Sequence, residues 1–212
     1  MDRYEKALKR GNLETIQSIV EQLPFRVHSR DHDGYTTLIL AARAGRLDVV
    51  VYLLAEGASI NDQENKWRVT ALYEASSHSK AHVVQHLLRS GADITLPNKG
   101  GWTPLMVAPI SGKGVETQRC LLEHGGNDMN AINITGGTAL HQAASAGFDQ
   151  PELVARLLEA GADPTIIDKN GRTALDLARK EGFIDISKTR LLEVSLPRIQ
   201  CFSTKVYSDS IL

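Results

Sequence analysis

Three histidines stand four positions apart, at His78, His82 and His86, and helical metal ligands use this spacing. Ser79 follows His78 at a position where we expect a turn between two helices, so only His82 and His86 can share one helix face. The sequence offers no third ligand to accompany them. A metal site and a solvated polar face both stay open, and we favour the polar face.

Other catalytic patterns are weaker still. Gly-Lys-Gly at 112–114 lacks the longer glycine-rich frame that cradles phosphates. The chain contains neither GxSxG nor HExxH, and no cysteine is placed with a histidine as a nucleophile and its base. The carboxylates are spread along the chain rather than paired. We therefore expect no catalytic residue, no cofactor and no metal, and a protein that is not an enzyme.

Composition restricts the partners. Of 212 residues, 42% are apolar and 23% charged, and the formal net charge of −1 gives no reason to expect nucleic acid or anionic lipid as a partner. No apolar run reaches the roughly 18 residues of a membrane span, and the first ten residues alternate charges where a secretory signal is apolar. Cys120 and Cys201 lie in unlike contexts, which favours a reducing compartment, cytoplasmic or nuclear.

The elements that position these residues follow from an internal repeat. A Thr-x-Leu core recurs with threonines spaced 34, 33, 35 and 35 residues apart, and an alanine follows each leucine three places later. A Leu-Leu pair followed by glycine repeats independently in a second register. The five threonines are Thr36, Thr70, Thr103, Thr138 and Thr173. Two registers that agree over at least four copies predict a stack of equivalent units.

Each unit is expected to contain two short helices. The threonine caps the first helix, and its leucine and alanine form a narrow apolar stripe that a neighbouring helix can approach closely. A turn residue, such as Gly45 or Ser79, reverses the chain into a second helix with Val and Leu at three-to-four spacing, and a glycine ends that helix. The segment before the next threonine is rich in Asp, Asn and Gly and predicts a turn.

These segments resemble ankyrin repeats. GWTPLMVA, GGTALHQAASAG and LLEAGADPTIIDKNGRTALDLA are similar to the family's turn, helix pair and T-P-L-H-x-A core. The resemblance implies an all-α solenoid of helix-turn-helix units joined by β-hairpin-like turns. It also implies that His141 hydrogen-bonds the turn of its repeat. Leu122 and Asp128 to Asn130 match a pattern that oxygenases hydroxylate in some ankyrin repeats.

We expect one repeat domain over residues 1–193, with a degenerate N-terminal cap at 2–29 and repeats that begin near 33, 66, 99, 134 and 169. Residues 194–212 form a tail. Its apolar residues favour docking on the last repeat, and Ser210-Ile211-Leu212 also fits a C-terminus that a strand-addition domain captures.

Three departures from the repeat are expected to change local structure. Arg68 stands where the other units have a glycine, and the turn before it has one extra residue, which predicts a differently shaped turn. Pro109 is expected to end the inner helix of repeat three near Ala108 and to make this the most mobile repeat. Pro151 is expected to open the second helix of repeat four.

Variable positions predict the binding surface. The residue before each threonine reads Tyr35, Val69, Trp102, Gly137 and Arg172, and in ankyrin-like stacks this row lies on the concave face. Aromatic residues concentrate in the first three repeats, as at interface hot spots, whereas repeats four and five look plainer. Trp102 either contacts a partner, which we favour, or covers its own turn. The predicted contacts are Tyr35, Trp67, Val69, Tyr73, His78, Lys99, Trp102, Met106 and Val107.

The sequence thus predicts a monomeric, non-catalytic adaptor, scaffold or inhibitor that binds a protein partner on the concave face of repeats one to three. The alternative is a targeting subunit that recruits a substrate to a larger enzyme assembly, with residues 194–212 as its second contact.

Overall fold

A computed structural model describes residues 13–22, 24–108, 114–145 and 151–180. Over these ranges the chain forms ten α-helices and one 3-10 helix. The only β-type pairing among them is an isolated antiparallel bridge between Arg30 and Thr36. The expected all-α class is confirmed. None of the helices in these ranges is long and apolar enough to cross a bilayer.

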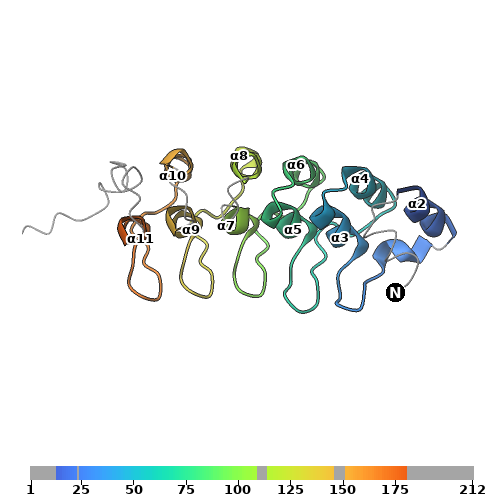
Figure 1. Ribbon diagram of the computed structural model, residues 1–212, viewed down its shortest axis with the longest axis horizontal. Coiled ribbons are helices and arrows are strands. Elements are labelled where there is room, and N and C mark those ends of the chain that lie inside the picture. Colours follow the sequence, from blue (N-terminus) through green and yellow to red (C-terminus); the bar gives the residue numbers. More distant parts are fainter. Residues whose placement is uncertain (1–12, 23, 109–113, 146–150, 181–212) are drawn as a thin grey trace, which may run out of the picture.

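The helices lie in two parallel rows (Figure 1). The inner row contains α3 (Thr37–Ala44), α5 (Ala71–Ser77), α7 (Pro104–Val107), α9 (Ala139–Ser145) and α11 (Ala174–Lys180). The outer row contains α2 (Leu13–Gln22), α4 (Leu47–Ala55), α6 (Ala81–Arg89), α8 (Val115–His124) and α10 (Pro151–Glu159). The 3-10 helix η1 (Pro24–His28) connects α2 to the first hairpin turn. Each inner helix packs on the next one, so the repeats form the expected solenoid.

Threonine caps start the inner helices. The Oγ1 atoms of Thr36, Thr70 and Thr103 accept from the backbone N–H three residues later, at 3.3, 3.0 and 3.4 Å. Thr173 forms a reciprocal cap with Asp176, in which each residue bonds the other's backbone N–H. These bonds satisfy N–H groups that a helix start leaves free, as the Thr-x-Leu pattern predicted.

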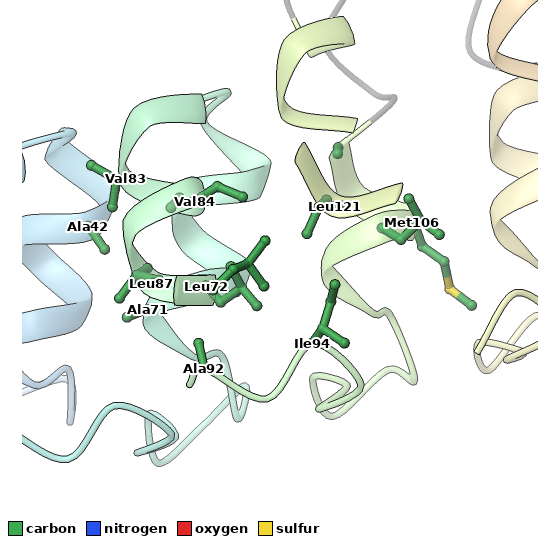
Figure 2. Close-up of a cluster of buried hydrophobic side chains, with 14 of the residues drawn as sticks. Ala42, Ala71, Leu72, Val83, Val84, Leu87, Ala92, Ile94, Met106 and Leu121 are labelled. Carbon is green, nitrogen blue, oxygen red and sulfur yellow. The ribbon is translucent and has the colours of Figure 1, made fainter. Parts of the chain in front are cut away.

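The core lies between the two rows and continues from repeat to repeat. Leu72 of α5 and Leu87 of α6 are fully buried within one repeat, and Met106 and Leu121 continue the cluster into the next repeat (Figure 2). The small side chain of Ala75 is also fully buried and lets neighbouring inner helices approach closely. No repeat encloses its own core, so each one depends on its neighbours.

The hairpin turns project from the inner row, and an Asp or Asn side chain organises most of them (Figure 1). Asn98 Oδ1 accepts from the backbone N–H groups of Gly100 and Trp102, at 2.8 and 3.0 Å. Asp31, Asn133 and Asp168 make the same pair of bonds in their own hairpins. Each turn is therefore held by one side chain that stabilises two backbone donors.

The hairpin turn of repeat two is organised by a different side chain. Its hairpin is one residue longer, and the longer side chain of Glu64 accepts from the backbone N–H groups of Lys66 and Trp67. Arg68 adopts a left-handed φ of 56°, close to the 75° of Gly101 at the equivalent position. The turn of repeat two thus differs from the others in its length and in its acceptor side chain, as the sequence predicted, while Arg68 keeps the left-handed backbone that glycine has elsewhere. The extra residue lies between Glu64 and Arg68, where the longer side chain of Glu64 replaces the Asp or Asn of the other turns.

Proline positions set the ends of two helices as predicted. Helix α7 ends at Val107 with Ala108 as its cap, directly before Pro109, and α10 begins at Pro151. Residues 109–113 and 146–150 lie outside the described residues, as do the start of the cap unit and residues 194–212. The expected mobility of repeat three and the domain boundaries stay predictions.

Candidate partner-binding surface

The residues directly before the five repeat threonines differ in how they are buried and paired. Tyr35 and Trp102 are half-buried, and both pack against the edge of the hydrophobic core. Arg172 is also half-buried, and its guanidinium donates to Asp168 Oδ2 at 2.9 and 2.7 Å. This pairing holds the pKa of the Asp168 carboxyl well below its usual range. The described part of the row thus offers aromatic surface in repeats one and three and a paired charge in repeat five.

Trp102 has both of the roles that the sequence left open. A Cβ atom added at Gly100 would lie 3.0 Å from Cδ1 of the indole, so the ring covers its own turn closely. The rest of the side chain stays partly exposed. Trp67 on the neighbouring hairpin is 52% exposed, and the Lys66 ammonium lies 5.4 Å from the centre of its ring. The two indoles therefore differ: one is partly structural, and the other is held out in solvent.

Tyr73 links the inner helix of repeat two to the next hairpin. Its hydroxyl accepts from Asn98 Nδ2 at 3.1 Å, and Asn98 also organises the turn that carries Trp102. Burial raises the pKa of Tyr73, with the nearby Glu74 carboxylate adding to the effect. Tyr73 and Trp102 are thus connected through a single asparagine, which limits their freedom before any partner binds.

A buried carboxylate lies among the predicted contact residues of repeats one and two. Glu74 Oε2 is 3.6 Å from Arg43 Nε of the preceding repeat and 3.4 Å from His78 Nδ1. Arg43 also lies over the ring of Tyr35, 5.8 Å from its centre. The side chain of Glu74 is only 9% exposed, and burial raises its pKa although Arg43 and His78 oppose the shift. These four residues form one connected charge-and-ring cluster across repeats one and two.

Three predicted contact residues do not fit a surface role. Val69 is 4% exposed, Met106 is 1% exposed and Val107 is 9% exposed. Met106 belongs to the central core cluster (Figure 2). Val69 was predicted from the row before the threonines, and Met106 and Val107 were predicted from the inner-helix register. For the latter two, α9 of the next repeat packs on α7. The remaining predicted residues, namely Tyr35, Trp67, Tyr73, His78, Lys99 and Trp102, are exposed or half-buried.

The spaced histidines have separate structural surroundings. His78 caps α5 and lies near Glu74, whereas His82 on α6 lies 3.0 Å from the carbonyl oxygen of Gly45 through Nε2. Among the described residues, one group of three has ligand atoms close enough for a cation: Asp31, His32 and Asp33 on the first hairpin. Asp31 Oδ1 in that group already accepts from two backbone N–H groups.

His141 has the turn-bonding role that the family resemblance implied. It is 2% exposed, and its Nδ1 lies 2.9 Å from Thr138 Oγ1. Its Nε2 lies 3.0 Å from the carbonyl oxygen of Arg172, and because a carbonyl only accepts, Nε2 carries the proton. His141 thus connects repeat four to the hairpin of repeat five. It also lines a polar hollow of about 230 Å³ between these two repeats.

Sequence reasoning missed two surface features. Ile132, Ile134 and Ile167 on the hairpins of repeats four and five are all more than half exposed, where a plainer surface was expected. The signal was visible as apolar residues on both sides of Asn133 and before Asp168. A groove of about 330 Å³ lies between α8 and α10, with Leu122 and Leu153 among its lining residues.

Known proteins share this architecture. The family model for ankyrin repeats matches three overlapping segments, at residues 5–98, 72–168 and 119–196, and so covers most of the chain. The chain belongs to the ankyrin repeat family. Ankyrin repeats are generally protein–protein interaction modules and are generally not enzymes.

Curated ankyrin relatives differ widely in length. A putative ankyrin repeat protein YahD from Escherichia coli is 30% identical over 71% of this chain and 92% of its own length. Ankyrin repeat protein nuc-2 from Neurospora crassa is 34% identical over 84% of this chain, and ankyrin repeat and SAM domain-containing protein 6 from Rattus norvegicus is 39% identical over 46%. The chain spans only 16% and 11% of these two longer proteins.

Proposed function

We propose that this ankyrin stack is a non-catalytic adaptor, scaffold or inhibitor that holds a protein partner on the concave face of repeats one to three. The observation that supports the proposal is a group of partly exposed aromatic rings on successive repeats. Tyr35, Tyr73 and Trp102 come from three successive repeats, and each is partly exposed. Aromatic side chains of this kind dominate binding energy at interfaces.

Preorganisation supports the same conclusion. Tyr35 is held beside Arg43, and Tyr73 is hydrogen-bonded to Asn98, so binding has little side-chain freedom to remove. Lys66, Lys99 and His78 supply polar groups around the rings. An apolar centre with a polar rim is the usual composition of a protein-binding surface. Cys120 is a free cysteine among the described residues, and we propose a monomer that works in a reducing compartment of the cell.

A comparison of three forms of the full chain tests this function. Affinity capture from a lysate is followed by quantitative mass spectrometry, with wild type, Tyr35→Ala/Trp102→Ala, and Gln85→Ala/Arg89→Ala as baits. Gln85 and Arg89 are exposed on α6 in the outer row, so this control changes a different face. We expect the control to retain a partner that the first variant loses. Equal retention by both variants would contradict the concave-face proposal, provided that thermal melting shows both folded.

A targeting subunit of a larger assembly is the second candidate. The name of the rat relative combines ankyrin repeats with a second kind of domain, and this supports a recruiting role. A chain that ends at Glu193 distinguishes the two candidates in the same capture experiment. Loss of every partner on this truncation would favour the targeting role, with residues 194–212 as the essential contact.

A further inference from the structure

The hairpins of repeats three to five share a pattern of exposure that the proposed concave face uses only at Lys99. Asn133 is buried and organises its turn, while Ile132 and Ile134 on either side of it are 59% and 62% exposed. In repeat five Asp168 is buried and Ile167 before it is 57% exposed. The residue before each turn acceptor and the residue after it, which is the first residue of the turn, are therefore both exposed in these hairpins.

Backbone hydrogen bonds hold neighbouring hairpins side by side. Ile134 N donates to the carbonyl oxygen of Gly100 at 2.9 Å, and Lys169 N donates to that of Thr135 at 2.9 Å. Equivalent positions of the three hairpins therefore form two short rows. One row is Pro97, Ile132 and Ile167, and the other is Lys99, Ile134 and Lys169. All six side chains are exposed, and we call this set the hairpin patch.

The hairpin patch is apolar and positively charged at both ends of its second row. Lys99 and Lys169 take part in none of the ion pairs of the described chain. The carboxylate next to Lys169, that of Asp168, is buried and already paired with Arg172. Since the whole chain has a formal net charge of −1, this local excess of positive charge is a property of the patch rather than of the composition.

The pattern does not extend to the hairpins of repeats one and two. The equivalent positions in repeats one and two are Arg30, His32, Gln63 and Asn65, which are all polar. Arg30 is committed to Asp62 and to backbone carbonyls, and Gln63 bonds across to the carbonyl oxygen of Pro97. Arg30 and Gln63 thus join neighbouring turns, whereas repeats four and five leave isoleucines in solvent. Stacking does not require those isoleucines, and clustered exposed apolar side chains mark contact sites.

We propose that the hairpin patch is a second interaction surface, which binds a protein segment that carries acidic side chains next to apolar ones. The apolar side chains would cover Ile132, Ile134 and Ile167, and the carboxylates would lie against Lys99 and Lys169. Lys99 and Lys169 flank the apolar centre and form no ion pair among the described residues. Charge complementarity therefore favours a partner segment with acidic side chains. Isoleucines offer no ring on which a nucleic-acid base could stack, so a peptide fits better than RNA.

A peptide-display selection on the full-length chain tests the proposal. The probe is a library of random linear peptides, and the enriched peptides are then measured in solution by fluorescence anisotropy. We expect enriched peptides to combine Asp or Glu with apolar residues. Ile132→Ser/Ile134→Ser/Ile167→Ser should weaken their binding at least about tenfold, because the apolar contact is lost. Tyr35→Ala/Trp102→Ala should leave it unchanged, which separates this surface from the concave face.

A charge variant keeps the test independent of the isoleucines. Lys99→Glu/Lys169→Glu should weaken the same peptides about threefold or more at low salt, and added salt should reduce the difference from wild type. Four results would overturn the proposal: no enriched peptide, enrichment of basic peptides, affinities that neither patch variant changes, or peptide binding that only the concave-face variant removes. Patch-dependent dimerisation in sedimentation, or patch-dependent binding to phosphatidylserine-containing vesicles without peptide binding, would also overturn it.

Discussion

At the scale of the residue, side chains of the same type have different surroundings. Trp67 and Trp102 both stand on hairpin tips, but only Trp102 packs on its own glycine turn and on the core edge. Glu74 lies on the inner helix α5, and its carboxylate is buried beside Arg43 and His78. What a residue contributes here depends on the neighbouring repeat.

The two tryptophans predict different effects on stability. Trp102→Ala should lower the free energy of unfolding by about 1–3 kcal/mol, because the half-buried indole loses its contacts. Trp67→Ala should change it by less than about 0.5 kcal/mol, since the ring is mostly in solvent. Urea unfolding followed by circular dichroism measures both values. A larger loss for Trp67→Ala than for Trp102→Ala would mean that the hairpins pack differently.

The buried carboxyl group of Glu74 predicts that the free energy of unfolding depends on pH. Burial raises its pKa above the ordinary 4.5, opposed by Arg43 and His78 and assisted by Glu64. The folded state therefore holds its proton to a higher pH than the unfolded state, so stability falls as pH rises from 4.5 through the folded pKa. Glu74→Gln removes this contribution. In urea titrations at several pH values, the variant should gain stability relative to wild type as pH rises over that window; a parallel pair of curves would contradict the assignment.

At the scale of the element, one acidic or amide side chain organises each hairpin turn. Asp31, Asn98, Asn133 and Asp168 each bond two backbone N–H groups, and Glu64 does so in the longer turn of repeat two. Positive φ angles at Gly34, Gly101, Gly136 and Gly171 complete the turns. Only repeat two places a side chain, that of Arg68, in this left-handed conformation.

Substitutions at this position should have opposite signs. Arg68→Gly should raise the free energy of unfolding by about 0.5–1 kcal/mol, because glycine adopts positive φ without steric cost. Gly136→Ala should lower it by at least about 1 kcal/mol, since φ is 78° and the new Cβ would lie 2.9 Å from Lys169 N. Differential scanning calorimetry can compare the two variants with wild type. A destabilised Arg68→Gly would show that the arginine side chain contributes more than its backbone costs.

At the scale of the whole molecule, the stack is a chain of neighbour contacts. Each inner helix packs on the next, and hairpin backbones bond in sequence, as from Lys99 N to the carbonyl oxygen of Trp67. In such a solenoid stability is approximately a sum of repeat and interface terms. The concave face of repeats one to three and the hairpin patch of repeats three to five therefore occupy overlapping but different parts of one stack.

His141 should control the coupling between repeats four and five. His141→Ala leaves the Arg172 carbonyl and the Thr138 backbone N–H without their side-chain partner, which should cost about 1–3 kcal/mol. Because the lost contact crosses one interface, repeat five should unfold before the rest of the stack. Amide exchange measured by mass spectrometry should show faster exchange over 168–180 than over 70–90 in the variant. A uniform change along the chain would show that His141 does not act at this interface.

Sequence alone determined the local structure of this protein. The threonine caps, the glycine turns and the helix ends at Pro109 and Pro151 depend on a few consecutive residues, so their spacing predicted both the helices and the solenoid. Only the tertiary structure decided which side chains reach the surface. Met106 and Val107 are buried because the next repeat covers them, Glu74 is held by an arginine of the repeat before it, and Ile132 and Ile134 stay exposed on their projecting hairpin. Burial between repeats depends on how closely neighbouring helices and turns approach, which no single repeat specifies.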